Sequence, residues 1–334
     1  MELPVYKTVN VVVVTYGNRW VYLRGLLAFL EGEPSVRKVI VIDNASPYDV
    51  ATACEQASFP KARVFRNDAN LGSAGGFSRG ISIACEEDNE LILLLDDDNL
   101  PRPGSIKGLI DTYNGLAGET CDGKVAVIAY RDSQHARFRI PLKPLFMQGR
   151  DFLCFNVFNA FQRHLGLVKV ENGPHSGPEY AVMSRGAAYS GMMFSPKLVS
   201  NIGLPNIDFI LYFDDVEYAI RMLKMGHTIW LDRENPVDDV QLNYSASAYD
   251  IPFWGFLSAD SDSKIYYNIR NRIYLDYFVD HKNSFPYMLN KFIFLSGITF
   301  LCLFTMKLRR LRTIFDAYRD GRGGRLGFKE GYQI

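Results

Sequence analysis

The sequence predicts an α/β fold with a mostly parallel central sheet, followed by a helical C-terminal extension. Within the first 130 residues, continuous apolar runs alternate with helix-like segments. Such runs are typical of parallel strands that helices cover on both faces. The C-terminal part instead contains an uncharged apolar run at 292–306, directly before a basic segment at 307–312. A helix over that run would reach about 23 Å, which is short of a ~30 Å hydrocarbon core.

The elements of the first half are expected in a regular order. A β-branched run at 9–14 predicts the first strand, turn residues follow it, and an apolar helix is expected at 20–30. The next elements carry the same kinds of signal: strands at 39–42, 62–66 and 91–95, and a helix near 106–113. Because ligands bind beyond the carboxyl ends of parallel strands, the polar loops after these strands predict the position of a site.

Composition excludes several classes of protein. The chain has 334 residues, with 37 basic and 37 acidic side chains, and 48% of its residues are hydrophobic. This apolar content excludes general disorder and suffices for one large core or two smaller ones. The net charge of zero argues against nucleic-acid binding by bulk electrostatics. We therefore expect no nucleic-acid partner.

The cysteines and the N-terminus favour a cytosolic location. The five cysteines are odd in number and widely spaced, and they form no CxxC motif. We expect reduced core thiols rather than disulfides or a zinc site. Residues 1–8 contain no long apolar run, so we expect no secretory signal there.

A glycine-rich passage at 70–80 follows the third expected strand. It lacks the GK[ST] of a P-loop and the strand–GxGxxG–helix order of a dinucleotide-binding fold. Two interpretations stay open. The passage is either a tight loop whose glycines adopt positive φ, or a place where backbone N–H groups approach a nucleotide.

Three adjacent carboxylates, Asp96, Asp97 and Asp98, follow the apolar strand at 91–95. Adjacent acids repel each other, so their presence at a strand end points to a ligand. On an extended chain Asp96 and Asp98 point the same way. Two hard oxygen ligands on one side suit a Mg²⁺ or Mn²⁺ ion that also holds a diphosphate. The alternative is a helix N-cap with solvated acids.

Six motifs occur in the order seen in glycosyltransferase family 2, and the chain resembles that family from about residue 9 to residue 271. The motifs are VVVVTYGNR, VIVIDNAS, NLGSAGGFSRG, LLLDDDNLP, AAYSGMMFS and YFDDVEYAIRMLKMGH. The match is most similar to bacterial galactofuranosyl- and rhamnosyltransferases of cell-surface polysaccharide synthesis, which IYYNIRNR at 265–272 also resembles. The resemblance implies the GT-A fold, a nucleotide-sugar donor and inverting transfer.

The resemblance also implies the residues of the donor site. Asp43 would contact the uracil or thymine ring, and Thr15, Tyr16 and Arg79 would lie near the nucleotide. Further candidates come from the same motifs, and they are Asn70, Gly72 and Asp97.

The resemblance makes Asp96 and Asp98 the metal-binding pair, for Mn²⁺ or Mg²⁺. Many relatives carry a third, histidine ligand after the helix that follows the second acidic cluster. This chain has Asp238 and Asp239 there instead. We name Asp239 as the candidate ligand, and Asp238 or the absence of a third ligand stays open.

The second acidic cluster comprises Asp214, Asp215 and Glu217, before a helix expected at 218–225. Acids at a helix N-terminus are stabilised by the dipole, so capping is one interpretation. Inverting transfer, however, needs one general base for the acceptor hydroxyl. The resemblance assigns that role to Asp215 first and Asp214 second, and Glu217 would orient the acceptor.

The resemblance divides the chain into a nucleotide-sugar-binding half at 1–130, an acceptor-binding half at 131–255 and a helical extension at 256–334. The run of acids at 96–98 looks more like galactofuranosyltransferases than like rhamnosyl relatives. UDP-galactofuranose is therefore the first choice of donor and dTDP-rhamnose the second. The acceptor would be a lipid-linked glycan or polysaccharide hydroxyl, as in O-antigen synthesis. The rival classes are a non-catalytic glycan- or nucleotide-binding subunit and a nucleotidyltransferase.

The C-terminal extension is expected at a membrane surface. An apolar run beside a basic cluster is typical of an interfacial anchor on anionic lipid. The alternative is a buried helix, packed on the catalytic domain or on a second subunit. We expect a peripheral protein on the inner face of the cell membrane, and a homo-oligomer stays open. The upstream aromatic residues are expected to be mainly core, and they are Phe146, Phe152, Phe155, Phe158 and Phe161.

Overall fold

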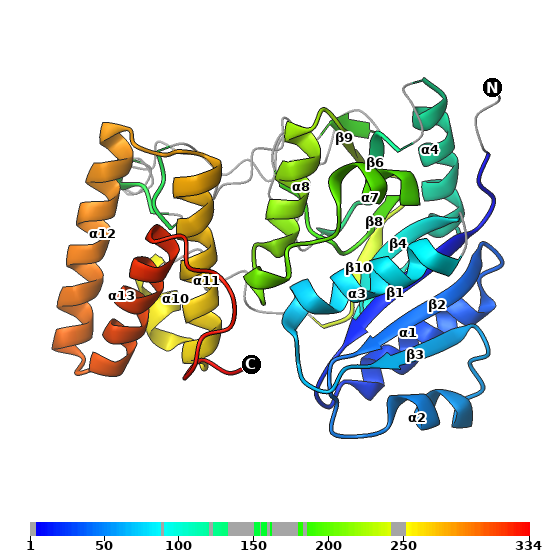
Figure 1. Cartoon of the computed structure of the whole chain (residues 1–334), viewed down its shortest axis with the longest axis horizontal. Coiled ribbons are helices and arrows are strands. Elements are labelled where there is room, and N and C mark those ends of the chain that lie inside the picture. Colours follow the sequence, from blue (N-terminus) through cyan, green and yellow to red (C-terminus); the bar gives the residue numbers. More distant parts are fainter. Residues whose placement is uncertain are drawn as a thin grey trace. The chain divides into compact units, whose positions relative to one another are not determined.

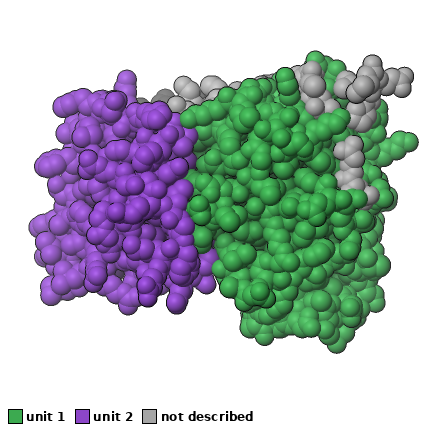
Figure 2. All heavy atoms as spheres, in the orientation of Figure 1, with its two compact units in different colours: residues 1–142, 178–210, 214–242 green, residues 143–177, 211–213, 243–334 purple. Residues whose placement is uncertain are grey.

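The computed structural model describes residues 5–87, 90–119, 123–132, 150–153, 155–158, 161, 180–182, 186–241 and 252–334. They form two compact units, which are coloured separately in Figure 2. Unit 1 takes its residues from 1–142, 178–210 and 214–242. Unit 2 takes its residues from 143–177, 211–213 and 243–334.

Unit 1 is built on an eight-stranded sheet with the order β3-β2-β1-β4-β8-β6-β9-β7 (Figure 1). Its strands are β1 (Val9–Thr15), β2 (Val36–Asp43), β3 (Ala62–Arg66), β4 (Leu91–Asp96), β6 (Val125–Ala129), β7 (Tyr180–Val182), β8 (Met192–Phe194) and β9 (Thr228–Asp232). Only β7 and β8 run opposite to the other strands of this sheet. The prediction of a mostly parallel α/β sheet is therefore confirmed. A small antiparallel ladder joins β5 (Asn99–Pro101) to β10 (Val237–Asp239).

Helices cover both faces of this sheet. Alternate residues of each strand point to opposite faces, so a strand can contribute to two cores. The helices of unit 1 are α1 (Trp20–Gly32), α2 (Val50–Gln56), α3 (Gly72–Glu87), α4 (Ser105–Glu119), α7 (Pro196–Ile202) and α8 (Asp214–Lys224). Val11 and Val13 of β1 pack in the core with α1, α2 and α4. Val12 and Val14 pack in the other core with α3, α7 and α8. All seven residues of β1 are consequently buried.

The glycine-rich passage is a helix, which corrects the expectation of a loop with several glycines at positive φ. Only Gly72, the first residue of α3, has a positive φ, of 70°. A Cβ on Gly76 would lie 2.6 Å from Val14 Cγ1, and one on Gly80 would lie 2.3 Å from Val12 Cγ1. These glycines therefore allow α3 to pack closely against β1.

Unit 2 is helical and confirms the expected C-terminal helices. It contains α10 (Pro252–Ser258), α11 (Asp262–Tyr274), a π-helical turn η3 (Leu275–Val279), α12 (Phe285–Phe304) and α13 (Leu308–Arg322). Phe152 packs between Tyr287 and Phe294, with ring centroids 5.8 and 5.5 Å away. Phe155 is also buried, whereas Phe158 and Phe161 are exposed. Phe146 lies outside the described residues.

The thiols in the described part of the chain are free, as expected. Cys54 and Cys302 are buried, and Cys85 is partly buried. Cys121 and Cys154 lie outside the described residues. Burial raises the pKa of Cys54 and of Cys85 to about 11. These two thiols are therefore protonated, and hence poor nucleophiles, near neutral pH.

Candidate active site

Polar residues end the four adjacent parallel strands of the sheet at one edge. Thr15 at the end of β1 pairs in register with Asp43 of β2, and Asp43 pairs with Arg66 of β3. On the other side, Val14 pairs with Asp96, the last residue of β4. The first acidic cluster and the candidate nucleotide residues thus lie along one sheet edge, where open α/β sheets bind ligands.

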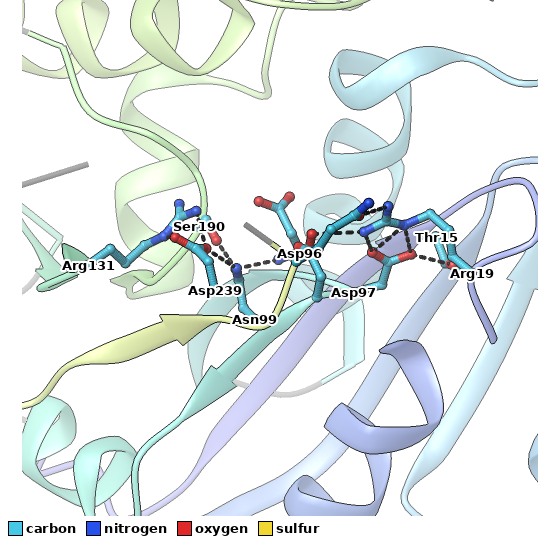
Figure 3. A network of polar contacts seen from close by, with 10 residues as sticks. Thr15, Arg19, Asp96, Asp97, Asn99, Arg131, Ser190 and Asp239 are labelled. Carbon is cyan, nitrogen blue, oxygen red and sulfur yellow. Dashed lines mark hydrogen bonds and ion pairs between the residues drawn. The ribbon is translucent and has the colours of Figure 1, made fainter. Parts of the chain in front are cut away.

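Arg19, from the loop between β1 and α1, holds two carboxylates of the first cluster (Figure 3). Its Nη2 lies 2.6 Å from Asp97 Oδ1 and 2.9 Å from Asp98 Oδ2. Arg19 Nε and Thr15 Oγ1 also donate to Asp97 Oδ2, at 2.9 and 2.7 Å. Asp97 is only 2% exposed. Thr15 and Arg19 therefore hold this carboxylate in the loop, and its expected contact with the donor stays a prediction.

Replacing Arg19 with alanine is expected to destabilise the fold strongly. The substitution leaves the buried Asp97 carboxylate without its cation, and breaking a buried pair typically costs about 3–5 kcal/mol. Lys107→Ala is the matched control, because its ion pair with Asp111 is solvent-exposed and worth about 0–1 kcal/mol. Urea-induced unfolding measures both. Equal losses of unfolding free energy in the two variants would contradict the organising role of Arg19.

A second network surrounds Asp96 on the side away from Arg19 (Figure 3). The backbone N–H of Asp96 donates to Asn99 Oδ1 at 2.9 Å, and Ser190 Oγ donates to the same oxygen. Asn99 Nδ2 donates to Asp239 Oδ1 at 2.9 Å, and the guanidinium of Arg131 pairs with that oxygen too. Burial raises the pKa of Asp96 to about 6, because desolvation and neighbouring Asp98 outweigh Arg131.

The structure separates the two acids considered for the third metal ligand. Asp239 is paired with Asn99 across β10 and β5, so it lies beside Asp96, while Asp238 points to the opposite side. Both oxygens of Asp238 accept from Arg102 at 2.9 Å. Among the described residues, however, no three His, Cys, Asp or Glu side chains form a group that could hold a metal ion.

The predicted three-carboxylate set of Asp96, Asp98 and Asp239 is therefore not brought together. The physical reason is that arginines bind two of its members: Arg19 holds Asp98 and Arg131 holds Asp239. Asp96 forms none of the ion pairs found among the described residues. Asp96 and Asp98 nevertheless offer hard oxygens at one strand end, which fits a divalent ion whose remaining ligands are phosphate oxygens and water.

The residues expected to bind the nucleobase lie in a hydrogen-bonded network at the ends of β2 and β3. Asp43 is buried and accepts from Arg66 Nη1 at 2.6 Å and from the Ser46 N–H at 2.8 Å. Arg79 donates to the carbonyl of Arg66 at 2.8 Å. The structure thus gives Arg79 a role in holding this network, behind Asp43.

The remaining donor candidates lie at the start of α3 and in the β1–α1 loop. Asn70 Oδ1 accepts from the Gly72 N–H at 3.0 Å, and Asn44 Nδ2 donates to the Gly72 carbonyl at 2.9 Å. Tyr16 is 45% exposed, and the Arg19 guanidinium lies 5.4 Å from its ring centroid. Of these residues, Tyr16 offers the most exposed surface on which a ligand could pack.

The second cluster opens α8, which begins at Asp214 rather than at residue 218 as expected. Asp214 is buried; Ser73 Oγ donates to its Oδ1 at 3.0 Å, and its Oδ2 has no hydrogen-bond partner. Burial and the adjacent Asp215 raise the pKa of Asp214 well above its ordinary value. Asp215 is partly exposed, and burial together with the charge of Asp96 raises its pKa to about 6. The pKa of Asp214 is thus raised by its burial and by Asp215, and Asp215 is the member of the pair that is partly exposed.

Glu217 does not face the site as a free carboxylate. Arg221 donates to both of its oxygens, at 3.0 and 2.9 Å. The same guanidinium donates to the carbonyls of Ile202 and Leu204 at the end of α7. Glu217 is thus ion-paired with Arg221, and its expected role in orienting an acceptor stays a prediction.

Sequence reasoning missed Arg19, Arg131 and Ser190. Arg19 and Ser190 lie inside the motifs VVVVTYGNR and AAYSGMMFS. Their place inside these motifs could have identified them. A cation such as Arg19, close in sequence to a strand end, can pair with acids that follow a neighbouring strand. Arg131 follows β6, a strand that the sequence reasoning did not identify.

Comparison with known proteins matches part of the chain to one family. Residues 10–164 match the family model described as glycosyl transferase family 2. No match was found among curated proteins.

Solved structures also resemble the chain. The mannosyltransferase PcManGT from Pyrobaculum calidifontis, in complex with GDP-Man and Mn²⁺, is 14% identical, with a TM-score of 0.50, over 93% of this chain and 74% of that one. TarS 1–349 from S. aureus in complex with UDP is 13% identical, with a TM-score of 0.45, over 97% of both chains. GalNAc-T7 with UDP, GalNAc and Mn²⁺ is 12% identical, with a TM-score of 0.49. The match covers 70% of this chain and 43% of GalNAc-T7.

The family match covers β2, β3, β4, β5, β6 and all of β1 except Val9, together with the loops that carry Asp43 and the first acidic cluster. The likeness to PcManGT covers 93% of the chain and shows that the fold is shared. The ordered motifs, the sheet and the family model agree with one another. Residues 10–164, just under half of the chain, therefore match glycosyltransferase family 2, and the chain has a GT-A-like fold.

Proposed function

We propose that this glycosyltransferase is a metal-dependent, inverting enzyme that transfers a sugar from a nucleoside diphosphate to an acceptor hydroxyl. One observation carries the proposal. The two acidic clusters are separate along the sequence, yet the charge of Asp96 raises the pKa of Asp215. A site for the diphosphate and a base for the acceptor therefore lie within electrostatic reach of each other, as a single displacement requires.

The proposed reaction is an in-line displacement at the anomeric carbon. Asp215 takes the proton from the acceptor hydroxyl while its oxygen forms a bond to that carbon. The bond between the anomeric carbon and the phosphate oxygen breaks on the opposite side, and its electron pair leaves with the nucleoside diphosphate. A Mn²⁺ or Mg²⁺ ion, when bound, would offset the charge of the diphosphate. Asp96 and Asp98 would hold it.

The proposed donor is UDP-galactofuranose, and dTDP-rhamnose is the alternative. The support is the resemblance of the run Asp96-Asp97-Asp98-Asn99 to galactofuranosyltransferases. Asp43 supports a pyrimidine nucleotide of either kind, because a carboxylate accepts from the N3–H that uracil and thymine share. Only the sugar specificity of the enzyme can separate the two.

The test is a panel of nucleotide sugars incubated with the full chain and Mn²⁺, with release of nucleoside diphosphate as the readout. The panel holds UDP-galactofuranose, dTDP-rhamnose, UDP-galactose and GDP-mannose. Metal-dependent release of UDP or dTDP supports the proposal. Binding of a nucleotide sugar without release, even with added glycan acceptors, would favour the non-catalytic subunit.

We also propose that the acceptor is lipid-linked and that α12 lies on the cytoplasmic membrane surface. Within the described residues, α12 is the one helix long and apolar enough to cross a membrane by length and composition. One of its faces is buried, and that face includes Tyr287, Phe294 and Ile298. Since this face packs inside unit 2, the helix suits the interface better than a full span.

The opposite face of α12 is apolar and exposed. We call it the α12 apolar face; its residues are Phe285, Met288, Phe292, Phe300, Leu303 and Phe304. Phe285 and Phe304, near its two ends, are each 79% exposed. The side chains of Arg309 and Arg312, in the helix that follows, are each 86% exposed. An apolar face beside exposed cations complements an anionic lipid surface.

Arg310 does not belong to this basic surface. Like Arg309, it is ion-paired with Asp262, at 2.9 Å, but its side chain is only 13% exposed and also donates to the carbonyls of Phe256 and Ala259. It therefore closes the end of α10. A substitution of Arg310 would test folding rather than lipid binding.

Changing Arg309 and Arg312 to glutamine is expected to weaken binding to phosphatidylglycerol vesicles by about 30-fold. Each basic residue near an anionic surface contributes ~1 kcal/mol, and 1.4 kcal/mol is tenfold in affinity. Vesicle sedimentation measures the effect, and added salt should reproduce it. The matched control is Arg24→Gln with Lys107→Gln, which removes two exposed charges from unit 1. Unchanged vesicle binding of the Arg309 and Arg312 variant would contradict the proposed attraction of these cations to anionic lipid.

A further inference from the structure

The turn that precedes the proposed base is strained. Ile210, Tyr212 and Phe213 have φ values of 63°, 68° and 63°, although none of them is glycine. Bulky and β-branched residues rarely adopt this left-handed region. Such conformations persist only where the surroundings enforce them, and they gather at functional sites. Asp214 and Asp215 follow this turn directly in the chain.

One buried side chain of unit 2 holds the turn. Asn271 of α11 donates from Nδ2 to the carbonyls of Leu211 and Tyr212, at 2.9 and 2.8 Å. Asn271 is fully buried. Its Oδ1 accepts from Arg270 Nε at 2.9 Å, so the direction of the amide is set as well. Both N–H groups of the Asn271 amide therefore donate to backbone carbonyls of the strained turn.

A neighbouring cation covers the next residue of the turn. The guanidinium of Arg272 lies 5.8 Å from the ring centroid of Phe213, which is within cation–π range. Residues 211–213 accordingly belong to unit 2, while the chain re-enters unit 1 at Asp214. On the preceding side, the carbonyl of Ile210 accepts from the N–H of Ala74 in α3 at 3.2 Å. The turn is therefore fastened at each end.

We infer that Asn271, supported by Arg272, is a positioning residue for Asp215, and that this is the role of the IYYNIRNR motif. The inference rests on the proposed function. Without the amide, the turn can relax to the more favourable negative φ, which rotates the first turn of α8 and moves the carboxylate that it carries. A displacement of about 1 Å in a reacting group can cost 10²-fold in rate.

Asn271→Ala is expected to lower kcat by about 10–100-fold, with little change in donor affinity. Asn290→Ala is the matched control, because Asn290 is also a fully buried asparagine of unit 2. It too makes two hydrogen bonds to backbone: its Nδ2 donates to the Arg150 carbonyl, and its Oδ1 accepts from the Val157 N–H. It does not touch the turn. Asn271→Ser keeps one donor and should lose less. If Asn271→Ala fails to fold, the kcat of Asn271→Ser tests the inference instead, and a wild-type kcat in that variant would contradict it.

A readout independent of any donor is hydrogen–deuterium exchange of the backbone amides at 211–217. Exchange there should rise in Asn271→Ala and stay at the wild-type level in Asn290→Ala. Unchanged exchange in the Asn271 variant would overturn the inference whatever the substrate.

A double-mutant cycle separates positioning from a purely structural effect. If Asn271 acts through Asp215, adding Asn271→Ala to Asp215→Asn should cause no further loss of turnover. An equal additional loss would show that Asn271 acts elsewhere. If Asp215→Asn itself keeps wild-type turnover, the proposed base is wrong; if it loses turnover but Asn271→Ala does not, only the positioning role is wrong.

Discussion

Asp215→Asn is expected to lower kcat by ~10²–10⁴-fold while donor affinity stays near the wild-type value. This is the usual contribution of a positioned general base, and the amide cannot accept the acceptor proton. Single-turnover kinetics with the donor identified by the panel, together with donor titration by calorimetry, measure the two quantities. Loss of donor binding with turnover of bound donor intact would make Asp215 a binding residue.

Asp214→Asn is the matched control for this prediction. The two carboxylates are neighbours, but burial and Asp215 raise the pKa of Asp214 well above its ordinary value. Asparagine keeps the size of the side chain, and its Oδ1 can still accept from Ser73. We expect less than about tenfold loss of kcat. A larger loss than that of Asp215→Asn would make Asp214 the base.

The pH dependence of the rate provides a further check on Asp215. Its pKa is raised to about 6, and only the deprotonated form can act as a base. The rate should therefore be constant above about pH 6 and fall about tenfold per pH unit below it. In Asp215→Asn this acidic fall should become smaller, and the part that remains reports Asp96, whose pKa is also raised to about 6.

Asp96→Asn is expected to abolish Mn²⁺-dependent binding of the nucleoside diphosphate. Asp96 and Asp98 are the carboxylates at the β4 end, and the substitution removes one of the two charged oxygen ligands proposed for the ion. Asp98→Ala should have the same effect. Calorimetric titration of UDP with and without Mn²⁺ measures the loss.

Asp238→Asn is the control for the metal prediction. Asp238 carries the same charge near the β5–β10 ladder, but Arg102 occupies both of its oxygens. Mn²⁺-dependent binding should therefore be retained in this variant. Full activity of the wild type in excess EDTA would show that neither Asp96 nor Asp98 serves a metal.

Much of the fold could be predicted because its signals are local. The strand at 62–66 was predicted with the observed bounds, and the strand expected at 91–95 ends at Asp96. The apolar run at 91–95 can be satisfied only by burial on both faces, so it predicts a parallel strand. The glycines of α3 were misread because a close approach to β1 gives the same sequence pattern as a turn.

The sequence by itself determined which carboxylates stand at which strand and helix ends, since each follows a locally recognisable apolar run. Only the tertiary structure decided which of them meet cations. Arg19 pairs with Asp97 across 78 residues, and Arg131 pairs with Asp239 across 108. Asn271 reaches the turn before the proposed base across 59. These partners are chosen by the order in which strands and helices pack, and periodicity along the chain carries no information about that order.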